Sequence, residues 1–171
     1  MGGDQSLNLD GNIYRTSDTG DSKAGDISNT TYSLAAAFSF LKAHTLTVAF
    51  QKVNGDTPFD YIGVGKNNRG GDSIFLANSI QYSDFNAPGE KSAQIRYDIK
   101  MAEYGVPGLS FMTRYVTGDN IDVGSGTDAK EHELDLEAKY VIQEGAAKDL
   151  SFRVRNAIYR ANSSYDGDVN D

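Results

Sequence analysis

The chain has 171 residues, of which 39% are hydrophobic, and this length corresponds to one domain. It contains no cysteine, which excludes a disulfide framework, a thiolate metal site and a cysteine nucleophile. Its formal net charge of −8 argues against nucleic acid or anionic lipid as a partner. No apolar run approaches the roughly 18 residues of a membrane-spanning helix, so helical spanning is excluded.

Seven stretches of the chain alternate apolar and polar side chains, which is the pattern of a strand with one apolar face. Glycine is frequent (18), proline is scarce (3), and tyrosine and phenylalanine (10 and 8) supply all the aromatic residues. This profile suits strands and turns better than helices. The expected strands are, in chain order, Gln5–Thr16, Asn29–Leu41, Thr45–Val53, Ser92–Ala102, Leu109–Thr117, Glu131–Ile142 and Leu150–Ala161.

Short and long connections between these strands alternate along the chain. The first two strands flank the polar, glycine-containing loop Ser17–Ser28, whereas only Lys42-Ala43-His44 joins the second strand to the third. The later connections are the turn 104–108, the loop Gly118–Lys130 and the turn Gln143–Asp149.

The longest connection is Asn54–Lys91. A structureless loop of this length inside a compact domain is uncommon unless it is functional, and folding inward over a pore is one such function. The alternative is an extra strand at Ser73–Phe85 that forms a hairpin with the strand after it.

The last expected strand shows the alternation most clearly. Leu150 and Val154 fall on one face, and Arg153 and Arg155 fall on the other. A strand that crosses a bilayer needs roughly 9–11 tilted residues, and short turns on one rim with long loops on the other are typical of an outer-membrane β-barrel. Strands of a soluble sandwich also alternate, so periodicity alone leaves the environment open.

The strand count predicts something larger than a small closed barrel. Bacterial barrels close with an even number of strands, because an open edge in lipid leaves backbone groups unpaired. Here seven strands are followed by the polar stretch Asn162–Asp171. We therefore expect part of a larger barrel, or eight strands if Ser73–Phe85 is counted.

Several short motifs resemble the OprD-type outer-membrane porins. In chain order they are Gly55-Asp56-Thr57-Pro58-Phe59-Asp60-Tyr61, Asp84-Phe85-Asn86 with Pro88-Gly89-Glu90, Arg96-Tyr97-Asp98, Tyr104-Gly105-Val106-Pro107-Gly108-Leu109 and Arg153-Val154-Arg155-Asn156. Their order and spacing cover nearly the whole chain. The resemblance implies an antiparallel transmembrane β-barrel in the bacterial outer membrane, in contact with its lipid.

The resemblance also implies which part of the barrel this chain forms. It corresponds to the C-terminal part of an eighteen-stranded barrel, with Asn54–Lys91 as one long extracellular loop and the whole of 1–171 as a single barrel segment. The N-terminal half of the family barrel and its final strand have no counterpart here. Family members take up small anionic or zwitterionic nutrients, such as carboxylates and amino acids, along a ladder of arginines that faces an acidic region.

Charged residues on the polar strand faces match this implied ladder. Guanidinium groups bind carboxylates bidentately and keep their charge, and charged ladders in a pore select ions by sign. The candidate substrate-binding arginines are Arg96, Arg114, Arg153 and Arg155, and the acidic residues that alternate with them are Asp98, Asp135 and Glu137. The alternative is that these residues form salt-bridge networks that fill a lumen or cover a solvated face.

Other chemistry has weak support in the sequence. His44 and His132 have no metal-ligand spacing around them, and both are expected to be solvated. The acidic loop Asp119–Asp128 lacks the twelve-residue spacing of a calcium loop, so we expect neither a metal nor a cofactor. Tyrosines near strand ends or on apolar faces fit an interfacial aromatic girdle; they are Tyr14, Tyr32, Tyr97, Tyr115 and Tyr140.

The sequence therefore predicts a passive, selective channel for small carboxylate-bearing solutes, and no enzyme. Two alternatives remain open. One is a small barrel without transport, because about eight strands leave an interior just wide enough for side chains. The other is a soluble ligand-binding barrel, which requires apolar residues to point inward and the arginines outward; the diagnostic apolar residues are Phe38, Phe40, Phe50 and Phe111.

Overall fold

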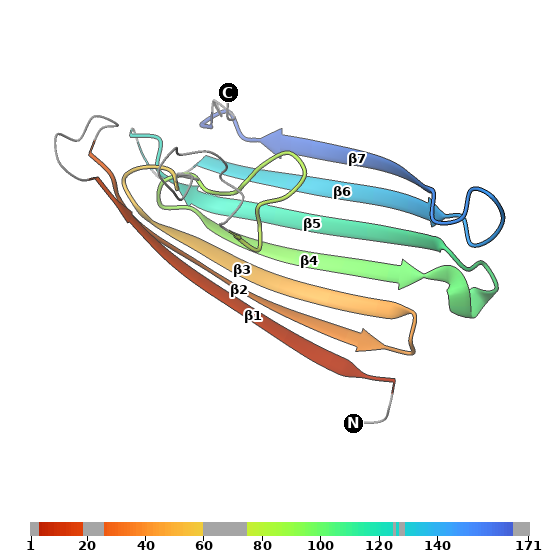
Figure 1. Ribbon diagram of the computed structural model, residues 1–171. Helices are drawn as coiled ribbons and strands as arrows, with labels where there is room; N and C mark the ends of the chain where they lie inside the picture. Colours follow the sequence, from red (N-terminus) through yellow and green to blue (C-terminus); the bar gives the residue numbers. More distant parts are fainter. Residues whose placement is uncertain (1–3, 19–25, 60–74, 125, 127–128, 166–171) are drawn as a thin grey trace.

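The computed structural model of the protein describes residues 4–18, 26–59, 75–124, 126 and 129–165 (Figure 1). Seven strands form one antiparallel sheet in the order of the chain. They are β1 (Ser6–Ser17), β2 (Ser28–Phe40), β3 (His44–Gly55), β4 (Lys91–Lys100), β5 (Leu109–Ile121), β6 (Ala129–Val141) and β7 (Ser151–Ala161). The prediction of seven antiparallel strands is confirmed, and each predicted strand has its counterpart.

Every strand differs from its predicted bounds by at least one residue at one end, and two of the differences change a connection. β4 ends at Lys100, and the expected strand residue Met101 instead begins the short 3-10 helix η1 (Met101–Tyr104). β5 extends to Ile121 through a register shift after Gly118, so the following loop is shorter than expected. The part of the chain that the structure describes contains no helix long and apolar enough to cross a membrane.

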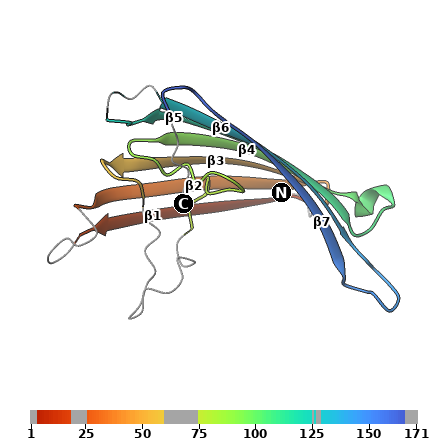
Figure 2. The same ribbon diagram turned by 90° about the horizontal axis from the view of Figure 1, so that it is seen from above.

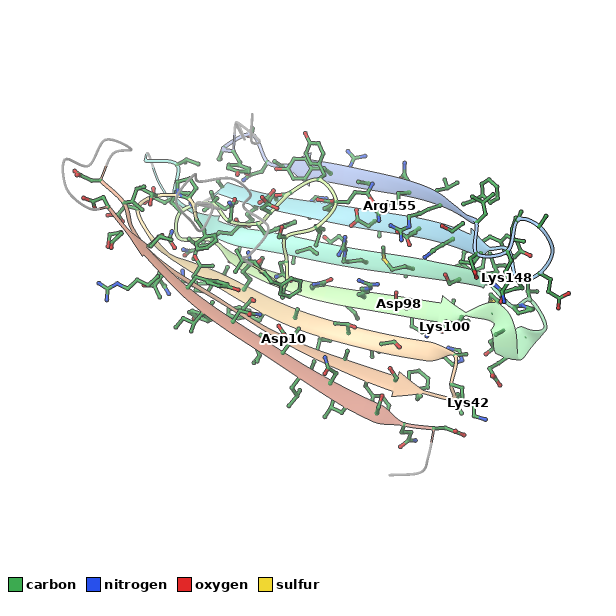
Figure 3. All side chains as sticks on the ribbon, viewed as in Figure 1. Asp10, Lys42, Asp98, Lys100, Lys148 and Arg155 are labelled. Carbon is green, nitrogen blue, oxygen red and sulfur yellow. The ribbon has the colours of Figure 1, made fainter. Side chains whose placement is uncertain are left out.

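The sheet is curved, and its two ends carry different connections (Figures 1 and 2). The short connections β2–β3, β4–β5 and β6–β7 lie at one end, which we call the short-turn end; Lys42, Lys100 and Lys148 mark it in Figure 3. The longer connections lie at the opposite end, the loop end. This alternation of short and long connections is the arrangement that the sequence predicts.

The two faces of the sheet have opposite chemistry. On the face that we call outward, large apolar side chains are exposed: Ile13 and Val154 are each 72% exposed and Leu34 is 60% exposed. On the inner face, Gln51 and Glu133 are fully buried. Within the strands, most of the buried side chains are therefore polar, whereas many large apolar side chains are exposed.

A protein surrounded by water shows the reverse distribution, because it buries apolar side chains and exposes polar ones. A continuous apolar band on the outside of the sheet fits contact with lipid. The soluble-barrel alternative is wrong for this reason: Phe38, Phe50 and Phe111 are 37–43% exposed on the outward face, opposite the arginines.

Residues 75–90, which we call the inward segment, cover the inner face near its loop end (Figure 1). Its side chains Leu76 and Phe85 are each 1% exposed, as is Phe59, which lies four residues after the end of β3. Residues 75–85 contain no strand, so the alternative of an extra strand is not supported there; 73 and 74 lie outside the described residues. Folding of this connection over the sheet agrees with the expectation for Asn54–Lys91, of which 60–74 lie outside the described residues.

Candidate functional site

Strand register brings the predicted charged residues together on the inner face. Arg96 on β4 lies opposite Arg114 on β5, which in turn lies opposite Asp135 on β6. One row nearer the short-turn end, Glu137 on β6 lies opposite Arg155 on β7. Because residues two apart on a strand share a face, these rows form one patch across four strands; Figure 3 labels Asp98 on β4 and Arg155 on β7.

The first two arginines are already held by carboxylates. Arg96 binds Asp98 of its own strand through two hydrogen bonds, from Nε to Oδ2 (2.8 Å) and from Nη2 to Oδ1 (2.7 Å). Arg114 donates from Nε (3.0 Å) and Nη2 (2.6 Å) to Oδ2 of Asp135. The Asp135 side chain is fully buried and that of Arg114 is 14% exposed, so this pair is fixed in position.

The other two arginines share one carboxylate and remain more open. Glu137 accepts a hydrogen bond from Arg155 Nε at 2.8 Å and lies 3.6 Å from Arg153 Nε. The side chains of Arg153 and Arg155 are 44% and 45% exposed. With four guanidinium groups and three carboxylates, the patch carries one net positive charge, and its accessible part is the pair Arg153 and Arg155.

A groove of about 330 Å³ runs between this patch and the inward segment. Arg96, Arg114, Glu137, Arg153 and Arg155 line one side of the groove. Residues 79–81 of the inward segment line the opposite side, and Met112 also borders the groove. The groove therefore brings a positively charged wall close to a segment from a distant part of the sequence.

Amide side chains of the sheet fix the inward segment in this position. Gln51 donates from Nε2 to the carbonyl oxygens of Asp84 (3.1 Å) and Phe85 (2.9 Å), and its Oε1 accepts the backbone N–H of Asn78 (2.9 Å). Gln94 donates to the carbonyl oxygen of Ala77 (2.9 Å). Irregular structure alone would leave these backbone groups of the segment unpaired, and the side chains of the sheet supply their hydrogen-bond partners.

Carboxyl groups of β6 hold the next part of the segment. Glu133 accepts the backbone N–H groups of Tyr82 (2.9 Å) and Ser83 (2.8 Å) through its two oxygens, and Glu131 accepts the Ser83 hydroxyl at 2.8 Å. Glu90 closes the segment by accepting the N–H of Ala87 at 3.0 Å. Burial and the neighbouring Glu131 charge raise the pKa of Glu90 from 4.5 to about 10, so Glu90 is a neutral acid at pH 7.

Close packing explains why glycine stands at position 118. Gly118 lies where β5 passes the buried Glu90 side chain, and a Cβ atom there would collide with the Glu90 carboxyl group and press on the Phe85 ring. The absence of a side chain therefore lets the end of the inward segment pack against the sheet.

The sequence identified the charged patch but missed its surroundings. Residues 79–81 have no chemical signature, and their place in the groove depends on how the long connection folds. In the sequence, Gln51 and Glu133 are simply polar positions of alternating strands, and nothing in the pattern indicates that they bind backbone groups. Alternation along the strand already placed Lys139 on the same face as Glu137, and the strand register adds that it lies opposite Arg153.

Two smaller expectations are wrong. His44 is not simply solvated, because its Nδ1 and Nε2 atoms form hydrogen bonds with the hydroxyl groups of Tyr97 (2.6 Å) and Tyr104 (2.9 Å). Tyr14 does not belong to an outward girdle, because it lies on the inner face, where its hydroxyl accepts the N–H of Phe75 at 3.1 Å. Tyr32, Tyr115 and Tyr140 are exposed on the outward face, as a girdle requires.

An outward apolar band, a charged inner groove and a connection folded over that groove define the class of β-barrel porins. The sequence matches the family described as outer membrane porin, OprD family, over residues 1–171, and the chain belongs to this family. Its members are porins of the bacterial outer membrane, and porins are channels rather than enzymes. The predicted family, localisation and non-enzymatic class are confirmed.

Individual relatives support this assignment. The chain is 60% identical to Porin D of Pseudomonas aeruginosa over 187 aligned positions, which cover 100% of the chain and 42% of that protein. It is 36% identical to the Porin-like protein GalP of Pseudomonas putida, over 84% of the chain and 32% of that protein.

Solved structures agree. The crystal structure of OprD from Pseudomonas aeruginosa matches with a TM-score of 0.84 at 57% identity, over 96% of this chain and 46% of that one. The crystal structure of OccK10 (OpdN) from Pseudomonas aeruginosa matches with a TM-score of 0.84 at 41% identity, over 95% and 44%. The chain therefore spans less than half the length of these relatives.

Proposed function

We propose that the chain forms part of the wall of an outer-membrane channel for the passive, selective diffusion of small carboxylate-bearing solutes, including amino acids. The observation that carries this proposal is the groove of about 330 Å³ between the arginine patch and residues 79–81. In the proposal Asn54–Lys91 is the extracellular connection that narrows the route, and 1–171 is one segment of the barrel.

Arg153 and Arg155 are the first contacts of the solute carboxylate in this proposal. Both are nearly half exposed and share Glu137, so their donors are not used up by one partner. Residues two apart on a strand lie about 7 Å apart, a step over which a carboxylate can begin a new contact before it leaves the old one. Arg96 and Arg114 extend the positive wall towards the loop end.

The acidic residues have two roles in this mechanism. Asp98, Asp135 and Glu137 form ion pairs with Arg96, Arg114 and Arg155, and in the proposal these pairs orient the guanidinium planes. Their negative charge also gives an amino group of a zwitterion a place to bind. The surplus of one positive charge favours anions over cations.

Single-channel recording of the barrel with Arg153→Gln and Arg155→Gln tests the proposal. We expect a loss of anion preference and weaker block by small carboxylates. The control is Lys42→Gln with Lys148→Gln, which removes the same charge at the short-turn end (Figure 3). Unchanged selectivity and unchanged block in the arginine variant would show that the patch does not bind solutes.

A non-conducting barrel is the second candidate, because each of the three carboxylates of the patch is paired with an arginine, as in a lumen filled by its own side chains. The same recordings separate the two candidates. Stable insertion into a bilayer without measurable conductance would favour the filled lumen.

A further inference from the structure

Charged side chains on the outward face occur only near the loop end of the described strands. Alternation along each strand and the strand register place them there. The cations are Arg15, Lys52, Lys91, Lys130 and Arg160, accompanied by His132, and the one carboxylate is Asp119. Five cations against one carboxylate make this rim positive, although the whole chain has a net charge of −8.

Two pairs within this rim bring basic residues directly together. Lys52 on β3 lies opposite Lys91 on β4, and His132 on β6 lies opposite Arg160 on β7. Like charges directly opposite each other destabilise a sheet. Among the described residues, the ion pairs within 4.0 Å involve none of the five cations. Lys91 also lies opposite Asp119 on β5, and Lys52 Nζ donates a hydrogen bond to the carbonyl oxygen of Gly89 at 2.7 Å. The strand residues of the rim still carry a surplus of positive charge that an anion would neutralise.

The position of the rim indicates where such an anion comes from. Ile13, Phe50 and Ile158 are exposed apolar side chains. Each lies on the same strand as Arg15, Lys52 or Arg160, two residues further from the loop end. A molecule that contacts both these apolar side chains and the basic side chains of the rim needs an apolar part along the strands and a negatively charged part at the loop end. This is the arrangement of a membrane lipid with a phosphorylated headgroup.

We propose that the loop-end rim of the outward face binds the phosphate groups of a lipid of the outer leaflet. Lys52 and Lys91 hold one phosphate, and His132 and Arg160 with Lys130 hold a second. A phosphate monoester carries about −1.5 to −2 charges and three acceptor oxygens at pH 7, so it can bind two cations at once. In barrels of this type the long loops are extracellular, which places the rim at the outer leaflet.

A basic outward rim differs from what the net charge of −8 alone predicts. The buried carboxyl groups Glu131, Glu133 and Asp135 contribute to the negative total but lie on the inner face, behind the sheet. A lipid headgroup at the outward rim meets the basic side chains first. Local sidedness, rather than the sum over the chain, decides the sign of the surface that the lipid contacts.

The test measures lipid bound to the protein purified in detergent, by native mass spectrometry. The probes are lipid A with two phosphates, the same lipid after phosphatase treatment, and inorganic phosphate alone. The variant is Lys52→Gln with Lys91→Gln, and the control is Lys42→Gln with Lys148→Gln, which removes two charges at the short-turn end. We expect the first variant to lose roughly 30-fold in affinity for phosphorylated lipid, about fivefold for each cation removed, and the control to be unchanged.

Thermal unfolding distinguishes lost binding from lost folding. Without lipid, the Lys52→Gln, Lys91→Gln variant should be about as stable as the parent protein, because the lost repulsion between the two lysines is offset by the lost Lys52–Gly89 hydrogen bond and the lost attraction between Lys91 and Asp119. With phosphorylated lipid, the parent protein should become the more stable of the two. Equal lipid affinity in the variant and the control, equal binding of the dephosphorylated lipid, or equally tight binding of free phosphate would each overturn the proposal.

Discussion

Glu133 is the residue whose replacement tests most directly how the inward segment is held. Its two oxygens accept the backbone N–H groups of Tyr82 and Ser83, and its side chain is fully buried. Glu133→Gln keeps the shape but replaces one carboxylate oxygen with an amide NH2 group, which donates instead of accepting, so one buried N–H loses its partner. A buried donor without a partner costs about 1–3 kcal/mol, which corresponds to roughly a 5- to 150-fold larger population of the detached segment.

Hydrogen exchange followed by mass spectrometry on the folded barrel measures this population. The amides of Tyr82 and Ser83 should exchange faster in the variant by about the same factor, whereas the strand amides of β2 should not change. Glu103→Gln, in the exposed η1 helix at the short-turn end, is the matched control. Unchanged protection at Tyr82 and Ser83 would show that Glu133 does not hold the segment.

Three further predictions follow from burial and charge. Asp135→Asn should destabilise the folded barrel by about 3–5 kcal/mol, because it leaves the largely buried Arg114 without its counter-ion; denaturant titration in lipid vesicles measures this. Val154→Lys should cost about 2–4 kcal/mol in the same assay, since it places a charge in the apolar band. The pKa of Glu90 is raised from 4.5 to about 10, so the unfolded chain loses this proton first and stability should fall as the pH rises between those values. Glu90→Gln should flatten that decline, and thermal midpoints at pH 5 and pH 9 would show it.

The strands were predictable because a lipid-facing strand carries its signal in every second residue. Phe152, Val154, Arg153 and Arg155 already define two faces in the sequence, and the structure places them on those faces. The end of β4 was predicted less well. Met101 continues the alternation of apolar residues, so the pattern extends the strand past Lys100. In the structure Met101 instead begins η1, which ends at Gly105 in the left-handed conformation.

The groove was predictable only in part. Strand alternation is enough to place Arg96, Arg114 and Asp135 on one face, and antiparallel pairing brings them side by side. The opposite wall comes from residues 79–81, whose position depends on hydrogen bonds to side chains of three strands. Such contacts have no period, so a pattern along the chain cannot reveal them.

One geometric rule produces both surfaces that we connect with function. Successive side chains of a strand point to opposite faces, so a strand that places Arg155 in the groove must place Val154 and Asn156 on the outward face. The same rule separates the buried carboxyl group of Glu131 from the outward-facing Lys130 and His132 beside it. A one-residue shift in register would exchange the two surfaces and bring carboxyl groups into lipid. The alternation of basic and acidic residues over Lys130, Glu131, His132 and Glu133 therefore adds to the sidedness that the apolar residues of β6 define.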